Sequence, residues 1–434
     1  MGGIMQSIRF LALAGISSLA LSFPAFAQSA DDAEAERATS SDEIIVQARR
    51  RDESVQDVPL VVNAVTSEQI DKLNIRDVRE ITSVVPGLSL VSNTNGIGSS
   101  SSMRGVNHDV NVSGNNGTIQ YYINDVPASS NLALQAMFDI SQISVERGPQ
   151  GTLRGRSTPS GAINIGWRKP DLDEVGASLS GTLGSAGVKN LQFGIGVPVI
   201  KDMLAVRVAG LIDEGRGNRG RRVNSTGKPH TATKAIRATA VIEPFSFLKG
   251  GFVFQRMSFR GTQFDQVQSM SEVVPGYALP AVERAITGNI FPFRAPSAGT
   301  SLAGNYGTIG LSDRKAVMFT PRNVATDFRF YQWNAEADVA GQRLIYLGSK
   351  TKTKFHPVTN SDVGAIWPAL TLQQDTRTHS HDTSHEIRLQ NDARIAGMFD
   401  YVIGYFRQSG GFPTGPSFHK GSGGCAPLLS GTGK

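Results

Sequence analysis

The chain of 434 residues lacks several features that hold other exported or membrane proteins together. It has a single cysteine, Cys425, so no disulfide can form within the chain. Beyond residue 27 it has no run of about 18 uncharged apolar residues, so any later segment that crosses a membrane must do so as β-strands. Charged residues make up only 18%, too few for a disordered chain, while 47 glycines suit β-structure with many turns.

Signatures of catalysis are missing as well. We find neither a Ser/His/Asp pattern nor paired carboxylates. Gly148–Gly155 has the glycines of a phosphate loop but lacks the Lys-Ser/Thr pair that would hold phosphates and magnesium. A net charge of +6 is modest for this length. The sequence therefore predicts no enzyme, no cofactor and no nucleic-acid partner.

The N-terminus has the three parts of a secretory signal peptide. Arg9 precedes an apolar run, Phe10–Leu21, and the Ala-x-Ala site in Pro24–Gln28 places cleavage after Ala27. A buried or membrane helix is the alternative. The run of about 12 residues is shorter than the roughly 20 that a spanning helix needs. We therefore expect residues 1–27 to be a signal peptide.

Residues 28–51 are expected to form a flexible leader that carries one short β-prone segment. Residues 28–41 are small, polar and acidic, and a basic cluster, residues 49–51, ends the leader. The segment between them suits an extended peptide that adds to the sheet edge of a partner. A first strand of the following domain is the alternative. The segment consists of Asp42, Glu43, Ile44, Ile45, Val46, Gln47 and Ala48.

Residues 52–170 show an α+β pattern. A helix is expected over Ser67–Val84, with Ser67 as its N-cap and an apolar stripe of Ile70, Leu73 and Ile81, and Pro86-Gly87 ends it. Short strands are expected near Leu88–Val91, Ile119–Ile123 and Ile143–Glu146.

Beyond residue 170 the pattern changes to strict alternation, with apolar side chains on one face and polar ones on the other, as in a transmembrane barrel. After a first short hairpin, the connections run about 3, 18, 4, 66, 2, 24 and 5 residues, which matches alternating periplasmic turns and extracellular loops. Nine strands are expected near residues 175–185, 189–199, 203–214, 233–243, 248–259, 326–339, 342–355, 380–391 and 397–409.

The predicted strands and loops bear on two binding hypotheses: successive residues of a strand face opposite sides, and loops lie beyond the strand ends. His379, His381 and His385 share the parity of Ile387, which points them to lipid or its margin and disfavours a metal site. The basic stretch Arg216–Arg222 is expected in an extracellular loop, where lipopolysaccharide phosphates are nearer partners than nucleic acid.

Seven motifs together resemble TonB-dependent outer-membrane receptors. Asp42–Ala48 resembles a TonB box, and the later motifs resemble the plug and an early barrel strand. The resemblance implies an α+β plug domain, residues 52–170, followed by a partial antiparallel transmembrane β-barrel, residues 171–434, with about 9 of about 22 strands. The six later motifs are Ser54–Leu60, Val84–Leu88, Met103–Val106, Tyr122–Pro127, Ile143–Ile165 and His385–Leu389.

The resemblance also implies a charge lock between plug and barrel. Arg104, Glu146 and Arg147 resemble plug charges that pair with barrel carboxylates, and Glu386 is the candidate partner because its parity turns it to the lumen. Surface salt bridges are the alternative for each residue. Two positions depart from the family pattern: Arg154 replaces a usual aromatic residue, and Ser160 replaces a frequent glycine.

By this resemblance the protein imports a scarce, bulky nutrient, a ferric siderophore first among the candidates, with energy from TonB and its ExbB/ExbD partners. A passive porin, a secretion barrel, a soluble secreted protein and a non-functional truncated receptor are the alternatives. Ligand contacts are expected in variable loops, including Leu302–Met318. Nine strands would leave an open edge in hydrocarbon, so we expect the barrel to be incomplete.

Overall fold

The computed structural model describes residues 45–46, 53–54, 61–92, 99–107, 117–135, 137–155, 158–217, 220–222, 227–264, 315–316, 321–360, 373–375, 377–392, 395 and 398–411. Residues 1–45 and 46–434 form separate units, and the second contains the plug and the barrel strands. The predicted signal peptide and most of the predicted leader lie outside the described residues. Among the described helices, none has the length and apolar character that a membrane crossing requires.

The plug is built on a mixed five-stranded sheet, in which β10 pairs in parallel with β7 and antiparallel with β9. Three antiparallel strands, β4 (Leu88–Ser92), β5 (Ser99–Met103) and β6 (Val106–Asn107), form a second sheet. The five-stranded sheet has the order β3 (Val61–Thr66), β9 (Ile140–Arg147), β10 (Gly161–Trp167), β7 (Ile119–Ile123) and β8 (Val126–Ala128).

The expected helix over Ser67–Val84 is wrong as a single element. It is α2 (Ser67–Lys72) followed by the 3₁₀ helix η1 (Val78–Ser83). Thr66, not Ser67, is the N-cap, because Thr66 and Gln69 form a reciprocal capping box. The helix ends because Asn74 takes a left-handed backbone conformation with φ of 50°. Leu73 is consequently 55% exposed instead of part of the apolar stripe.

The plug has a small apolar core between its sheet and its helices. Ile81 from η1 and Leu132 from α3 (Ser130–Gln135) pack with Ile143 and Val145 of β9, and all four are fully buried. Burial of such a side chain stabilises a fold by about 1.5–3 kcal/mol. The short helix α4 (Gly151–Arg154) lies between β9 and β10 in the chain.

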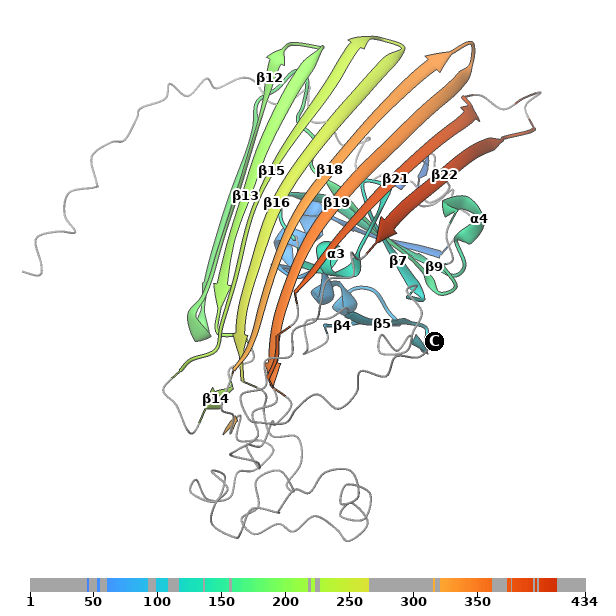
Figure 1. Ribbon diagram of the computed structural model, residues 1–434. Helices are drawn as coiled ribbons and strands as arrows, with labels where there is room; N and C mark the ends of the chain where they lie inside the picture. Colours follow the sequence, from blue (N-terminus) through green and yellow to red (C-terminus); the bar gives the residue numbers. More distant parts are fainter. Residues whose placement is uncertain are drawn as a thin grey trace, which may run out of the picture. The chain divides into compact units, whose positions relative to one another are not determined.

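The wall is a curved antiparallel sheet in which nine long strands follow one another in chain order (Figure 1). The predicted alternation is therefore confirmed, with several strands longer than expected and the last starting at residue 402 instead of 397. The strands are β11 (Gly176–Gly184), β12 (Val188–Ile200), β13 (Leu204–Gly215), β15 (His230–Phe245), β16 (Leu248–Gln263), β18 (Arg322–Val339), β19 (Gln342–Asn360), β21 (Thr378–Asn391) and β22 (Val402–Gly411).

Five shorter strands are described as well. β20 (Gln373–Asp375) pairs with β19 at the margin of the wall, and β14 (Arg221–Arg222) pairs in parallel with β17 (Lys315–Ala316). β1 (Ile45–Val46) and β2 (Glu53–Ser54) lie before the plug sheet in the chain.

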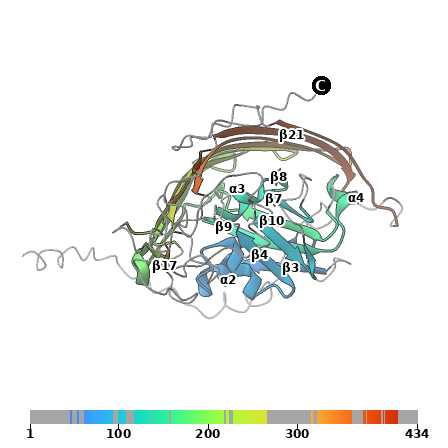
Figure 2. The ribbon, with the colours of Figure 1, turned by 60° about the horizontal axis from the view of Figure 1, so that its bottom comes forward.

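The wall has two chemically different faces, and the plug lies on its concave side (Figure 2). Met257 on β16 and its cross-strand partner Phe328 on β18 are fully buried on the concave face. Arg256 and Arg329, the neighbouring pair in the same register, are exposed on the convex face. Glu386 lies on the buried face, as its parity predicts.

Candidate functional site

Plug and wall are joined by apolar contacts, such as Trp167 packed edge-on against Phe330 with ring centres 5.5 Å apart, and by a polar set that centres on Asp139. This residue precedes β9, where its backbone is left-handed with φ of 52°. Arg207 of β13 grips its carboxylate with two bonds, Nε to Oδ2 at 2.8 Å and Nη2 to Oδ1 at 2.5 Å. Both side chains are almost completely buried. A bidentate pair of this kind fixes the orientation of both side chains. Loss of one partner leaves the other charge buried and unpaired.

A second wall arginine binds the same plug segment without a direct bond to the carboxylate. Nη1 of Arg237, on β15, donates to the backbone carbonyl oxygens of Phe138 at 3.1 Å and Asp139 at 3.2 Å. Its guanidinium carbon lies 3.6 Å from the ring centre of Trp167 and 4.2 Å from that of Phe138. Gln255 on β16 accepts from its Nε at 2.8 Å. A buried cation between two rings is strongly held.

A third plug–wall contact joins two amides. Asn124, in the turn between β7 and β8, donates from Nδ2 to Oε1 of Gln332 on β18 at 3.1 Å. Gln332 returns a bond from Nε2 to the backbone oxygen of Asn124 at 3.0 Å. The turn reaches the wall because Asn124 and Asp125 both have positive φ, 45° and 67°. The Asn124 side chain also accepts from the backbone N–H of Trp167 at 2.8 Å, so the turn is tied to β10.

Inside the plug, Arg154 is the most deeply buried charge. Its Nε donates to Oε2 of Glu146 at 2.9 Å, its Nη2 pairs with the other Glu146 oxygen, and its Nη1 lies 3.6 Å from Oδ1 of Asp125. The guanidinium stacks 4.5 Å from the ring centre of Tyr122. Burial by itself lowers the pKa of Arg154, but Glu146 and Asp125 outweigh it and the net shift is upward, so the group stays charged. Arg154, which stands where the family usually has an aromatic residue, is therefore a cation paired with carboxylates and stacked on the ring of Tyr122.

The four residues predicted as a charge lock occupy different settings. Arg104 is exposed in the turn between β5 and β6, with φ of 52°. Glu146 pairs with Arg154 of the plug, and Arg147 is half-buried at the end of β9. Glu386 is buried on the wall, where Arg388 of the same strand lies 3.4 Å away. A lock between these plug and wall residues stays a prediction.

The structure does bring the plug close to the wall beside Glu386. Gly155 ends α4 in a left-handed conformation with φ of 64°. A Cβ at this glycine would lie 3.5 Å from Cβ of Phe406, the cross-strand partner of Glu386. A side chain larger than hydrogen is therefore strained here in conformation and would contact the wall.

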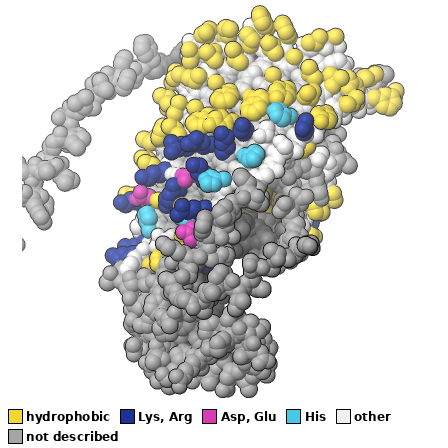
Figure 3. All heavy atoms as spheres, viewed as in Figure 1, with side chains coloured by type: hydrophobic (Ala, Val, Ile, Leu, Met, Phe, Trp, Pro, Cys, Tyr) yellow, Lys and Arg dark blue, Asp and Glu magenta, His cyan; other side chains and the backbone are white. Residues whose placement is uncertain are grey.

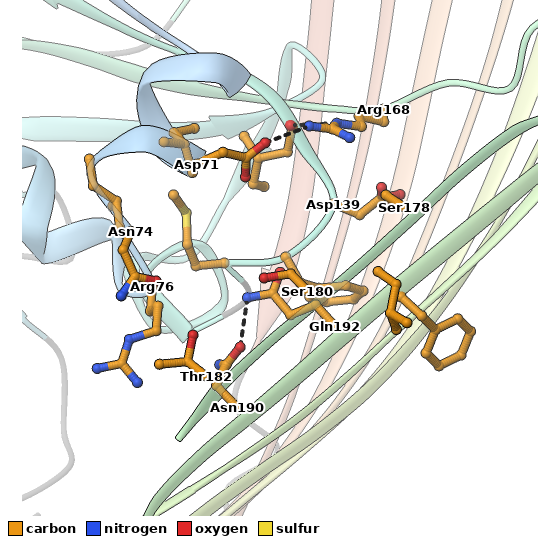
Figure 4. Close-up of a pocket in the computed structure, with 17 residues that line it drawn as sticks. Asp71, Asn74, Arg76, Asp139, Arg168, Ser178, Ser180, Thr182, Asn190 and Gln192 are labelled. Atoms are coloured by element: carbon orange, nitrogen blue, oxygen red, sulfur yellow. Dashed lines mark hydrogen bonds and ion pairs between the residues drawn. The ribbon is translucent and has the colours of Figure 1, made fainter. Parts of the chain in front are cut away.

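Two hollows lie between the plug and the first wall strands. One, of about 310 Å³, has hydroxyl and amide groups of β11 and β12 on its wall side, including Ser178, Ser180, Thr182 and Gln192 (Figure 4). The other, of about 390 Å³, reaches towards Thr231 and Gln263, at the wall ends that the long connections join. Arg76 and Asn190 line both, so the hollows meet there.

Arg76 differs from the other arginines at the hollows. Arg79 is paired with Asp77, and Arg168 lies 3.4 Å from Asp71. Among the described residues no ion pair is found for Arg76, whose backbone N–H donates to Glu80 at 2.8 Å. The carboxylates that line the hollows include Asp71 and Asp77, which face Arg168 and Arg79, so Arg76 is the lining arginine left to contact an anionic group of a ligand.

The remaining predicted sites are described only in part. Of Asp42–Ala48, Ile45 and Val46 form β1 and the remainder lies outside the described residues, as does most of Leu302–Met318. His379 and His381 are exposed on the convex wall face. In the part of the chain that the structure describes, no group of three His, Cys, Asp or Glu side chains is arranged to hold a metal ion.

Sequence reasoning missed Asp139, Arg207 and Arg237. The available signal was parity, since both arginines occupy inward positions of strands whose outward positions are apolar. Asp139 carried no such signal, because it belongs to no regular element.

Comparisons with known proteins identify the plug directly. Residues 54–162 match the family described as TonB-dependent Receptor Plug Domain. The pesticin receptors of Yersinia enterocolitica and Yersinia pestis are 28% identical over 153 residues, which is 35% of this chain and 22% of each relative.

Solved structures match most of the described fold. The ferric yersiniabactin uptake receptor FyuA of Yersinia pestis aligns with a TM-score of 0.61 at 17% identity, over 81% of this chain and 48% of that one. The alcaligin outer membrane receptor FauA of Bordetella pertussis aligns with a TM-score of 0.55 at 13% identity, over 85% and 50%. The chain therefore spans about half the length of these structures, and the likeness confirms the predicted fold class.

Proposed function

This chain belongs to the TonB-dependent receptors, a family of outer-membrane transporters that are not enzymes, and from that premise we propose that it takes part in active import of a ferric siderophore. The supporting observation is a family plug that lies on the concave face of a barrel-like wall and is held there partly by polar contacts. Such contacts can be exchanged for water when the plug moves, because water replaces the lost hydrogen bonds at modest net cost.

Energy for this import has to come from outside the outer membrane, which holds no ATP. We propose that TonB, driven by ExbB/ExbD, pairs with residues 42–48 by strand addition and pulls on the plug. The extended backbone of Ile45–Val46 is compatible with this mode. Lipopolysaccharide would surround the outer end of the wall.

The ligand class is proposed from two observations. Several solved relatives carry siderophore names, among them the siderophore receptor PiuA of Acinetobacter baumannii, with a TM-score of 0.56. The hollows that meet at Arg76 are lined by hydroxyl, amide, guanidinium and carboxylate groups, and the larger one reaches the wall ends that the long connections join. Ferric siderophores are bulky, oxygen-rich and commonly anionic, which suits both features.

The transport step is tested with Ile45→Pro in cells grown on a panel of iron-55 siderophores. Proline removes a backbone donor, so TonB-driven uptake should fall to the level of a tonB deletion while surface binding persists. Ser40→Pro, just before the box, is the matched control and should transport normally. Uptake through a passive porin would not change with either substitution. Normal uptake by the expressed Ile45→Pro protein would therefore overturn the proposal.

The ligand site is tested with Arg76→Gln. Removal of one charge-assisted contact should weaken binding of an anionic ferric siderophore about tenfold. Lys72→Gln removes a nearby exposed lysine that pairs with Glu68 and should leave affinity unchanged. Equal affinity of the two variants would exclude the hollows as the binding site without affecting the assignment of TonB-driven transport.

A further inference from the structure

The plug packs on most of the wall through apolar side chains, but not on its first two strands. The apolar core of the plug is continuous with inward side chains of β13, β16, β18 and β19, such as Leu211, Met257, Phe330 and Leu347. The structure describes β11 and β12 along their whole length, and neither strand contributes a side chain to this core. The smaller hollow lies in the seam between the plug and these two strands.

The wall side of this seam is polar and uncharged. From Gly176 to Thr182 of β11 and from Asn190 to Gly196 of β12, the inward positions hold only glycine, hydroxyl and amide residues. Gln192 donates from Nε2 to Oδ1 of Asn190 at 3.0 Å, and Asn190 donates from Nδ2 to Oδ1 of Asp213 at 2.8 Å. Asp213 lies near the end of β13 that a long connection follows, so we call this the outer end of the seam.

The opposite face of the same two strands is apolar. Leu179 of β11 and Leu191 of β12 are exposed on the convex side, where the wall carries a broad apolar band (Figure 3). A polar ligand is excluded from such a surface. Any route for it along β11 and β12 therefore lies on the side that faces the plug.

A buried ion pair closes the inner end of the seam, about 13 Å along β12 from Asn190. Arg207, held by Asp139, also donates from Nη2 to Oγ of Ser178 at 3.2 Å and from Nη1 to the backbone oxygen of Gly176 at 3.5 Å. Figure 4 shows Asp139 beside Ser178, away from Asn190. The guanidinium thus lies across β12 and reaches β11.

Gly194 of β12 makes room for this arrangement. A Cβ at Gly194 would lie 3.0 Å from Oδ1 of Asp139 and closer still to Nη2 of Arg207. A second ion pair at this end, Asp71 with Arg168 at 3.4 Å, joins α2 to the residue after β10, and both of its side chains are partly exposed. An exposed pair contributes at most about 1 kcal/mol, so Asp139–Arg207 is the stronger closure.

The seam is also the part of the interface that separates at the lowest cost. Exposure of apolar surface costs about 25 cal/mol per Å², whereas neutral hydroxyl and amide groups exchange partners with water at modest net cost. The hollow of about 310 Å³ lies at the lower limit for small-molecule sites, so a bulky ligand passes only when the seam widens.

We propose that the imported ligand crosses between the plug and β11–β12, and that the Asp139–Arg207 pair closes the inner end of this passage. When Asp139 moves away, Arg207 keeps Ser178 and Gly176 as acceptors, so the cation stays in place and the pair can close again. The proposal rests on the proposed import function and adds the route to it.

The test compares two engineered disulfides that tie the plug to different parts of the wall, both in a Cys425→Ser background. The β12 tether is Asp139→Cys/Gly194→Cys, because a Cβ at Gly194 lies beside the carboxyl group that a cysteine sulfur would replace. Arg207→Gln accompanies it, so that no buried charge is left without a partner.

The comparison tether, called the β22 tether, is Gly155→Cys/Phe406→Cys. A Cβ at Gly155 would lie 3.5 Å from Cβ of Phe406, within the range of about 3.5–4.5 Å that disulfides require. It ties the plug to the wall far from β11 and β12 in the strand order.

Uptake of an iron-55 siderophore that the unaltered protein transports is measured in cells before and after reduction with dithiothreitol. The oxidised β12 tether should lower uptake to the level of Ile45→Pro, and reduction should restore it. The β22 tether should transport normally in both states. Loss of uptake with both oxidised tethers would mean that the whole plug leaves the wall, and normal uptake with both would place the route elsewhere. Either result overturns the proposal.

A second pair of variants leaves the ion pair intact. Gln192→Trp fills the hollow from β12 and should lower uptake at saturating ligand, whereas Leu191→Trp, on the convex face of the same strand, should not. Equal uptake by these two variants would also overturn the proposed route. The unaltered protein and Ile45→Pro report on TonB-driven transport itself, so failure of the route is distinguished from failure of the import function.

Discussion

The two faces of the wall use the same side chain in opposite ways. Arg237 on β15 is the cross-strand partner of Gln255, and Arg256 is the next residue along β16. Arg237 points to the plug, is 1% exposed, and is held by two carbonyl oxygens, an amide and two rings. Arg256 points outward, is exposed, and has no ion pair among the described residues.

The difference arises from the surroundings of each face. The concave face meets a plug with fixed positions, so a cation there is stabilised only by protein groups placed in advance. The convex face meets mobile lipid, which can bring anions to the cation. Substitutions on the concave face should therefore act on plug stability, and those on the convex face on lipid binding.

The largest effect is expected for Asp139→Ala. It leaves Arg207 buried without its carboxylate and should weaken the attachment of the plug by about 3–5 kcal/mol. The measurements are the urea midpoint of plug release, followed by protease cleavage, and the permeability of cells to large antibiotics. Asp173→Ala removes an exposed carboxylate near Lys201 and is the matched control. Equal midpoints for the two variants would contradict the assigned contact.

A somewhat smaller effect, about 3 kcal/mol, is expected for Arg154→Leu. The change leaves the buried Glu146 without the guanidinium that neutralises it. Urea unfolding, followed by tryptophan fluorescence, measures the loss. Arg154→Leu/Glu146→Leu should recover part of it, since both charges are then gone. No recovery would show that Arg154 acts through packing on Tyr122 instead of through charge.

The smallest effect concerns the predicted lock of Arg147 with Glu386. A double-mutant cycle with Arg147→Ala and Glu386→Ala, read out by urea unfolding, should give a coupling of about 0.5–3 kcal/mol if plug and wall are paired here. Arg147→Ala alone should then also raise permeability to large antibiotics. Additivity of the two substitutions, with permeability unchanged, would favour separate local salt bridges.

Much of the fold could be predicted because it follows from local sequence patterns, such as the alternation of apolar and polar residues along a strand. Alternation along residues 204–209 fixes which side chains of β13 face the plug, since a strand turns each successive side chain to the other face. The same rule placed Glu386 inward and His381 outward. The helical periodicity that predicted a buried Leu73 failed, because the left-handed Asn74 ended the helix early.

What the sequence by itself determined is therefore the family, the nine wall strands and the face to which each wall residue belongs. Only the tertiary structure decided which inward arginine meets which plug group: Arg207 and Asp139 are 68 residues apart. The face on which a residue lies is a property of one strand, whereas such a pair depends on how the plug is seated against the wall. The same reason explains Arg154, whose partners come from β9 and from the turn after β7.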